Sequence, residues 1–209
     1  WSAAACGDDG GSSPSPSASP AGPTPNAERT DEALAAQLSH LAPALLMQAD
    51  VPPEYHLAVS QPVTRGQVAA ANVGIPRLAG FVQDSDLNGA WATFYLRDDP
   101  QTGLTSLIYE FESPASAQAF VDAIASLTGV DYPEATSVER VPSDKIEDKA
   151  QMMLYKLTAS RTYDYTWAQG RFAGQIVLRY STDIDSPEDR SLMLALARKQ
   201  ADLMRAMGQ

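Results

Sequence analysis

The stretch from Leu104 to Leu127, LTSLIYEFESPASAQAFVDAIASL, predicts a β-strand that leads directly into an amphipathic α-helix. Ser113 is a favourable N-cap residue, and Pro114 takes the first helical position, where a missing N–H loses no hydrogen bond. The apolar residues that follow recur with the i, i+3, i+4, i+7 spacing of a helix with one apolar face: Ala117, Phe120, Val121, Ile124 and Leu127. We therefore expect this helix to cover a sheet to which the strand belongs.

A second unit of the same design closes the chain, from Phe172 to Met207. An apolar strand is followed by Ser186 and Pro187, which repeat the cap, and then by a long helix. Its apolar face is interrupted by one polar residue, Gln200. The chain thus contains two strand-to-helix junctions that start in the same way.

Neighbouring strands are predicted to form hairpins, because short segments rich in turn residues separate them. The expected strands are Ala90–Arg97, Thr105–Glu112, Ala135–Val141, Tyr163–Ala168 and Arg171–Tyr180, with Gln151–Thr158 as a strand or a short helix. Strands, helix, strands, helix is an order typical of an α+β fold. We expect a mainly antiparallel sheet with helices packed on one face, and a duplicated strand-strand-helix unit is consistent with this order.

The N-terminal part predicts a helix from Thr30 to Met47 that is kinked or split at Pro43. A short helix is expected around Gln67–Ala71, between segments without clear periodicity. Before Ala27 the chain has no apolar periodicity and is rich in Ser, Pro and Gly, a composition that does not support a packed core. We expect a single domain over 27–209.

Cys6 is the only cysteine in the 209 residues, and it follows the small residues Ala3, Ala4 and Ala5. This arrangement resembles the cleavage and acylation site of bacterial lipoproteins, although Ala3 stands where that family usually has Leu. The resemblance implies a lipid on Cys6, residues 1–26 as lipobox remnant and tether, and an extracytoplasmic domain anchored to the cell membrane. Because residue 1 is Trp1, we expect an export segment upstream. The alternative is an inert cysteine in a tail.

The formal net charge of the chain is −11. A protein this acidic repels phosphate groups, so we expect neither nucleic acid nor anionic lipid headgroups as partners.

Motifs for catalysis or metal binding are missing from the sequence. His40 and His56 are the only histidines, and they lack the spacing of a zinc site. The segment Asp84–Gly89 matches the first half of a calcium-binding loop, but its twelfth position is Tyr95 rather than Glu, which favours an Asx-rich turn. We expect no metal and no cofactor.

Glu110 and Glu112 carry the alternative interpretation, a cell-surface hydrolase that uses carboxylates for acid–base catalysis. They share one face of a strand, and that face is solvated if Leu107, Tyr109 and Phe111 point to the core. Solvated carboxylates explain the pair without catalysis. We therefore expect a non-catalytic binding or sensor domain for a protein partner or a small ligand. Its architecture resembles that of uncharacterised bacterial surface lipoproteins, some with PsbP/Mog1-type or extracellular sensor domains.

Three rings, Tyr163, Tyr165 and Trp167, share one face of their strand. A hairpin closed by Gln169–Gly170 pairs Trp167 with Phe172 and predicts that the rings lie in the core. A slipped register would instead turn them outward beside Trp91 and Tyr95 and create an exposed aromatic patch. These five aromatic residues are the candidate binding residues of the sequence.

Overall fold

The computed structural model describes residues 25–98, 102–142, 146–147, 149–182, 184 and 186–207, with side chains from residue 32 onward. The predicted lipid attachment site at Cys6 and most of the predicted tether lie outside these residues.

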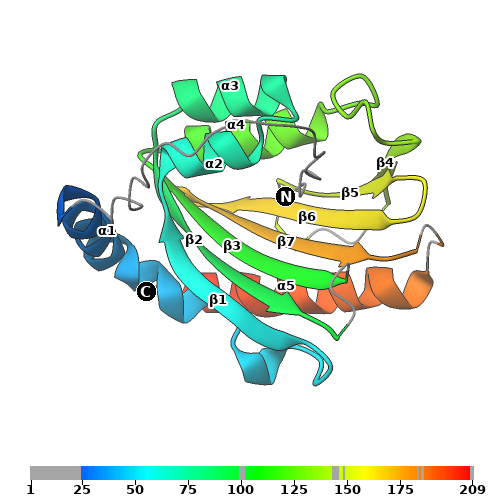
Figure 1. The fold of residues 1–209 in the computed structure, drawn as a ribbon, viewed down its shortest axis with the longest axis horizontal. Coiled ribbons are helices and arrows are strands. Elements are labelled where there is room, and N and C mark those ends of the chain that lie inside the picture. The colour runs from blue at the N-terminus through cyan, green and yellow to red at the C-terminus, as the bar shows by residue number, and fades with distance from the viewer. Residues whose placement is uncertain are drawn as a thin grey trace, which may run out of the picture.

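Seven antiparallel strands form one sheet with the order β1-β2-β3-β7-β6-β5-β4 (Figure 1). The strands are β1 (His56–Val63), β2 (Leu87–Leu96), β3 (Gly103–Phe111), β4 (Ser137–Val141), β5 (Ala150–Lys156), β6 (Arg161–Gln169) and β7 (Phe172–Tyr180). The α-helices are α1 (Pro25–Leu38), α2 (Arg65–Ala71), α3 (Pro76–Asp84), α4 (Pro114–Ala125) and α5 (Pro187–Met207), with the 3-10 helices η1 (Ser39–Ala44) and η2 (Gln48–Asp50). The α+β class and the antiparallel sheet are confirmed.

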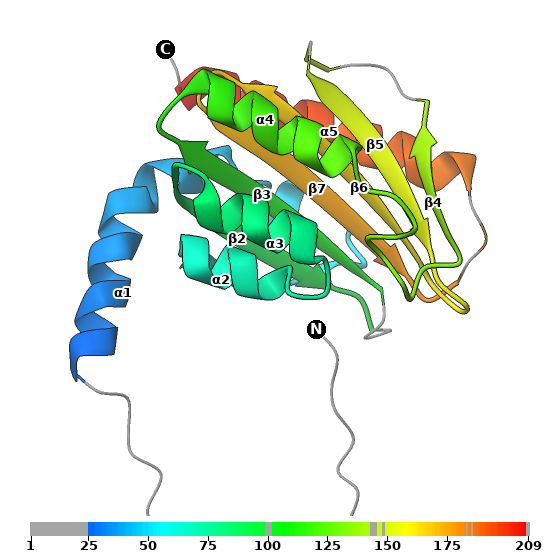
Figure 2. The same ribbon diagram turned by 90° about the horizontal axis from the view of Figure 1, so that it is seen from above.

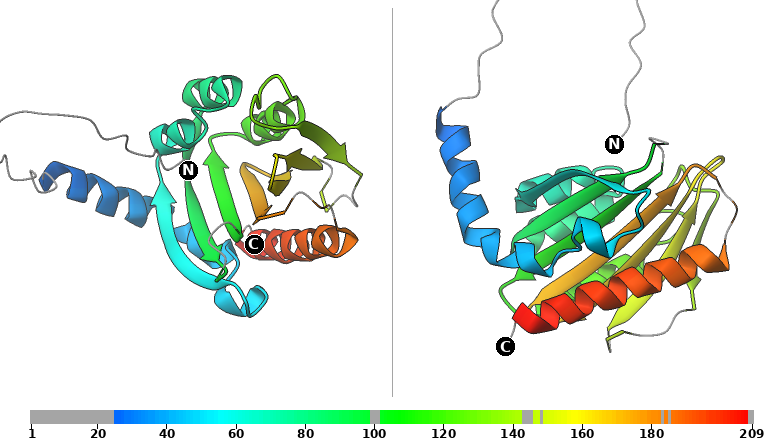
Figure 3. Two further views of the ribbon diagram at one scale, coloured as in Figure 1. Left: turned by 45° about the vertical axis from the view of Figure 1, so that its right-hand side comes forward. Right: turned by 90° about the horizontal axis from the view of Figure 1, so that it is seen from below.

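Helices cover both faces of this sheet, which corrects the expectation of one covered face. Helices α2, α3 and α4 lie on one face, here called the α4 face, and α5 crosses the other, the α5 face (Figures 1 and 2). Two separate apolar cores follow, one on each face. Figure 3 shows α5 running across the strands on its own side.

The opposite placement of α4 and α5 also bears on the idea of a duplicated unit. Strands β3 and β7 are adjacent and antiparallel. Two adjacent antiparallel strands are exchanged by a two-fold rotation about an axis perpendicular to the sheet, and this rotation does not exchange the two faces. If it related β2-β3-α4 to β6-β7-α5, both helices would lie on the same face of the sheet. Since they lie on opposite faces, no rotation relates the two units, and the duplication is not found in the architecture.

The α5 face is held together by the strand residues that point toward α5, α1 and η1. The largest buried side chains there are Trp167, Tyr55, Tyr95, Tyr163 and Tyr165. Gln200, the polar interruption in the apolar face of α5, is fully buried and accepts a hydrogen bond from Ser106 Oγ at 2.7 Å. Its Nε2 donates to the Leu107 carbonyl at 2.8 Å, so Gln200 ties α5 to β3.

The α4 face is organised by Phe120, whose ring centroid lies 4.7 Å from that of Tyr109 and 5.6 Å from that of Phe111. The predicted cap is present: Ser113 Oγ accepts a hydrogen bond from the backbone N–H of Ser116 at 3.1 Å, and Pro114 occupies the first turn. Ser116 Oγ donates in turn to Asp86 at 2.7 Å. The cap therefore starts α4 at the end of β3.

Two elements were missed in the N-terminal part. Strand β1 has six consecutive exposed residues and contains Pro62, so it lacks the alternation that marks a half-buried strand. Helix α3 starts at Pro76 and follows α2 after a short turn. The predicted helix from Thr30 is found as α1 and η1, with Pro43 inside the 3-10 segment. Among the described helices, none is long and apolar enough to cross a membrane.

Candidate functional site

One row of paired residues crosses all seven strands on the α4 face. Since directly paired residues point to the same side of a sheet, the register alone defines this row. It runs in order through Val59, Phe94, Thr105, Val177, Asp164, Met153 and Arg140. The row begins with apolar residues and reaches a carboxyl group on the fifth strand.

Exposure falls along this row from β1 toward β6. Val59 is 39 % exposed, Phe94, Thr105 and Val177 are partly exposed, and Asp164 is only 8 % exposed. Leu96, two residues beyond Phe94 on the same face, is 46 % exposed. We call Val59, Phe94, Leu96, Thr105 and Val177 the open strip. In Figure 2 the ends of β2 and β3 extend beyond α2 and α3, which leaves this part of the face without a helix above it.

Asp164 lies at the inner end of the open strip, in a buried polar network. Gln175 Nε2 donates to Asp164 Oδ2 at 2.8 Å, and Thr166 Oγ1 donates to Oδ1 at 2.8 Å. Tyr109 OH donates to Gln175 Oε1 at 2.6 Å. Three strands, β3, β7 and β6, each contribute to this network.

The charge of Asp164 is poorly compensated. Burial raises the pKa of its carboxyl to about 6, while the hydrogen bonds from Gln175 and Thr166 act in the opposite direction. Among the described residues, no cationic side chain belongs to the groups that act on this carboxyl. A buried carboxyl with neutral partners costs stability, and perturbed groups of this kind gather at functional sites.

Phenol groups surround the same carboxyl. Burial raises the pKa of Tyr109, Tyr132 and Tyr155, and the charge of Asp164 acts on each of them in the same direction. The rings of Tyr132 and Tyr155 are packed together, with their centroids 4.4 Å apart. The inner end of the open strip therefore offers one carboxylate and several aromatic rings.

The five aromatic residues singled out from the sequence lie on the opposite side of the sheet. Tyr163, Tyr165 and Trp167 are buried in the core of the α5 face, as the core interpretation predicted, and Tyr95 is buried there as well. Trp91 is partly buried, and its Nε1 donates to Ser60 Oγ at 2.9 Å. These residues do not form an exposed patch.

The hairpin register differs from the predicted one by two residues. Gln169 pairs with Phe172 and Trp167 with Gly174, so Gly170 and Arg171 form the loop. Gly170 has a φ of +57°, which glycine adopts without steric cost. An even shift keeps every ring on its predicted face, so the predicted core position of the rings is confirmed although the predicted pairing is wrong.

Glu110 and Glu112 correct a second expectation. The face of β3 that carries Glu110 was expected to be solvated if Leu107, Tyr109 and Phe111 point to the core. Both faces of β3 are covered, and Glu110 is buried. Its carboxylate pairs with Arg171 Nη2 at 2.7 Å and lies 3.4 Å from His40 Nε2. Glu112 is exposed. The two carboxylates do not converge on a cleft.

Among the remaining candidates, Asp86 has a structural role. Asp86, in the calcium-like segment, accepts the hydrogen bond from Ser116, and no group of three or more metal-binding side chains is found in the described part of the chain. His56 is exposed on β1.

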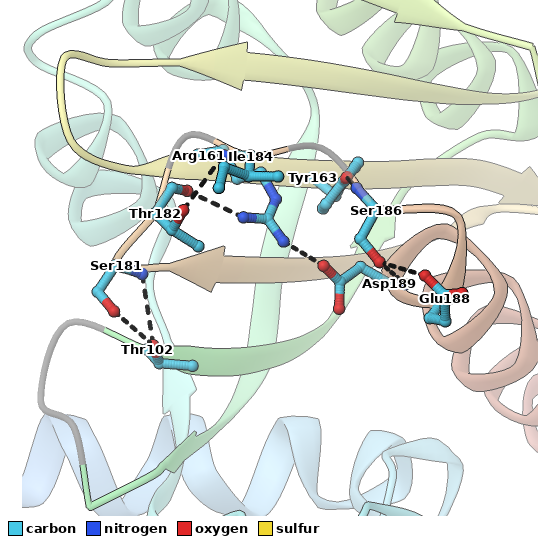
Figure 4. Close-up of polar contacts among 9 residues, drawn as sticks. All are labelled: Thr102, Arg161, Tyr163, Ser181, Thr182, Ile184, Ser186, Glu188 and Asp189. Carbon is cyan, nitrogen blue, oxygen red and sulfur yellow. Dashed lines mark hydrogen bonds and ion pairs between the residues drawn. The ribbon is translucent and has the colours of Figure 1, made fainter.

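A buried arginine fastens the start of α5 to the sheet (Figure 4). Arg161 Nη1 donates to the Thr182 carbonyl at 3.0 Å, Nη2 pairs with Asp189 of α5, and the guanidinium lies 4.4 Å over the Tyr180 ring. The N–H of Ser186 donates to Tyr163 OH at 3.2 Å. Each charge has its partner within this cluster, which explains it as an anchor for the helix.

A shallow groove of about 460 Å³ lies between α3 and α4. Its lining is mainly apolar, with Leu78, Phe81 and Leu127. At its rim Arg77 donates to the Ser126 carbonyl, and Asp122 pairs with Lys149. The polar residues of its lining, Arg77, Asp122 and Ser126, are exposed or partly exposed.

Asp164 and Gln175 were not singled out from the sequence. The available signal was an aspartate in the middle of a strand, with Thr162 and Thr166 beside it on the face opposite the rings. Aspartate is depleted in strands. A buried position for this residue therefore points to a specific role.

No protein-family model matches the sequence, and no curated protein matches it. The structure is similar to that of the extracellular domain of PknH from Mycobacterium tuberculosis, with a TM-score of 0.52 and 8 % identity, over 85 % of this chain and 96 % of that chain. The Rv0999 ortholog from Mycobacterium smegmatis aligns with a TM-score of 0.40 and 15 % identity, over 81 % and 97 % of the two chains. The likeness to the PknH domain shows a shared fold.

Proposed function

We propose that this chain is an extracytoplasmic, lipid-anchored domain that binds a small ligand or a protein partner and does not catalyse a reaction. The observation that carries the proposal is the row that leads from the open strip to Asp164. Apolar side chains next to a few convergent polar groups are the usual composition of a binding site. The fold shared with an extracellular domain supports the location.

The membrane anchor in this proposal rests on Cys6 and the residues around it. Two acyl chains are needed for stable attachment, because one gives only marginal binding. In the full gene expressed in its host, wild type should partition with membranes and Cys6→Ser should remain in the soluble fraction. Equal partitioning of both would exclude the anchor.

Binding at the open strip is tested with a panel of small metabolites in thermal-shift measurements. Phe94→Glu places a charge in the middle of the strip, and Leu96→Glu does so at its most exposed residue, where folding is least affected. Val73→Glu is the control, because Val73 is 75 % exposed and belongs to the turn after α2. Compounds that raise the Tm of wild type and of Val73→Glu should not raise the Tm of Phe94→Glu or of Leu96→Glu.

Binding of a small ligand is excluded if no compound of a broad panel stabilises wild type, and a protein partner is then the form of the proposal that stands. The proposal is wrong if the stabilising compounds act equally on the strip variants, since binding would then occur elsewhere.

A further inference from the structure

We propose that the open strip and Asp164 bind a small amphipathic zwitterion of the amino-acid type. Its ammonium group would contact Asp164, its carboxylate would contact Arg179, and its apolar part would lie on Val177 and Thr105. The inference rests on the proposed function, because it names the ligand class of the same site.

The ammonium group follows from the contacts of Asp164. A carboxylate offers about four lone-pair positions, and Gln175 and Thr166 use two of them. Both donors are neutral, so a cationic ligand supplies the charge partner that the buried carboxylate lacks. The ring of Tyr155 near the same carboxyl favours a cation further. A chain with a net charge of −11 also attracts cations over long range.

The carboxylate follows from Arg179, two residues beyond Val177 on the same face of β7. Arg179 pairs with Gly103 and Thr162 in the register and is exposed. Within the described residues it has no ion-pair partner. It lies diagonally across from Asp164, at a distance of about 7–8 Å that is typical of such neighbours. A ligand with only a positive charge would be repelled by Arg179, whereas a zwitterion satisfies both groups.

The apolar part follows from the spacing of the strands. Neighbouring strands are about 4.8 Å apart, so the path from Asp164 across Val177 and Thr105 to Phe94 is about 14 Å long. This length accommodates an aromatic or long aliphatic side chain, or a dipeptide. Gly103, which pairs with Leu96 and Arg179 in the next row, contributes no side chain there.

Access to the carboxyl passes Tyr132. This residue belongs to the segment between α4 and β4, where Thr128 and Asp131 bond mainly to each other. The ring of Tyr132 packs on Tyr155, and its phenol is close enough to Asp164 to be affected by its charge. A ligand would reach Asp164 by displacing this ring.

The test uses three probes that each contain a phenyl group. L-Phenylalanine carries both charges, phenethylamine carries only the ammonium, and 3-phenylpropionate carries only the carboxylate. Their Kd values are measured by titration calorimetry with wild type, Asp164→Asn and Arg179→Gln. Arg140→Gln is the matched control, because Arg140 is exposed on the same face at the far end of the row. Circular dichroism verifies that each variant is folded.

We expect wild type to bind phenylalanine more tightly than either partial probe. Asp164→Asn should raise the Kd of phenylalanine and of phenethylamine by roughly tenfold or more and leave the Kd of 3-phenylpropionate unchanged. Arg179→Gln should raise the Kd of phenylalanine and of 3-phenylpropionate. Arg140→Gln should bind all three probes as wild type does.

Equal affinity for the three probes, or unchanged affinity in both charge variants, would overturn the inference. Failure of all three probes, while compounds of the metabolite panel still bind at the open strip, would overturn the ligand class and leave the proposed function standing. If no compound binds at the strip, the ligand class and the small-ligand form of the proposed function both fail.

Discussion

Gly174 lies directly opposite Trp167 in the central hairpin, and the indole ring fills the space that a side chain at Gly174 would need. A Cβ at this position would overlap three atoms of the ring. The largest buried side chain of the core thus depends on the absence of a side chain on the neighbouring strand.

Gly174→Ala should therefore lower the free energy of unfolding by about 1–3 kcal/mol, the usual cost of overpacking a core. Gly80→Ala is the control, because Gly80 lies in α3 with no atom close to a new Cβ, and there the substitution should raise stability by about 0.5–1 kcal/mol. Urea unfolding measures both variants. A Gly174→Ala protein as stable as wild type would show that Trp167 can move aside.

Trp167→Ala and Tyr165→Ala should each cost about 3–5 kcal/mol, because both rings are fully buried. Thermal unfolding measures the loss. Unchanged stability would contradict their place in the core.

Asp164→Asn should stabilise the protein at neutral pH. Burial raises the pKa of Asp164 from 3.8 to about 6, so the folded chain holds this proton more tightly than the unfolded chain does. The contribution of Asp164 to stability is then largest below pH 4 and falls as the pH rises through 6. At pH 7.5 the variant should gain up to about 3 kcal/mol.

The pH dependence of this difference is the more specific measurement. The stability of Asp164→Asn relative to wild type should grow between pH 4 and pH 6. If the stability difference between Asp164→Asn and wild type shrinks from pH 4 to pH 6, the fold stabilises the ionised form of Asp164, and the prediction is wrong.

Gln200→Leu should destabilise the protein by about 1–3 kcal/mol, although it makes the apolar face of α5 continuous. The substitution leaves the buried Ser106 hydroxyl and the Leu107 carbonyl without this partner. Gln118→Leu places the same change on an exposed position of α4 and should be nearly neutral. Denaturant unfolding compares the two, and a stabilising Gln200→Leu would contradict the role assigned to the amide.

The strand-to-helix junctions could be predicted from the sequence because their signals are local. Ser113 and Pro114 lie next to each other in the chain, and the apolar spacing after them fits only one side of a helix. The side of the sheet that α4 and α5 cover is not a local property. It depends on how β3 and β7 pair, and this contact joins residues about seventy positions apart.

The candidate site could not be predicted for the same reason. Phe94 and Asp164 belong to one row only because β2 pairs with β3, β3 with β7 and β7 with β6. Strand β1, which supplies the exposed end of the row, carries no alternation that would mark it. The alternation around Asp164 indicated its face of the strand, but the burial of that face results from the packing of α4.

The most direct test of the central claim, that the open strip and Asp164 form the binding site, is amide chemical-shift mapping by NMR. The isotope-labelled protein is titrated with the compounds that stabilise it. The largest shifts should fall on Phe94, Thr105, Val177, Asp164 and Gln175, with small shifts in α5. Shifts that gather in the groove between α3 and α4, at Phe81 and Ala119, would contradict the account and place binding elsewhere.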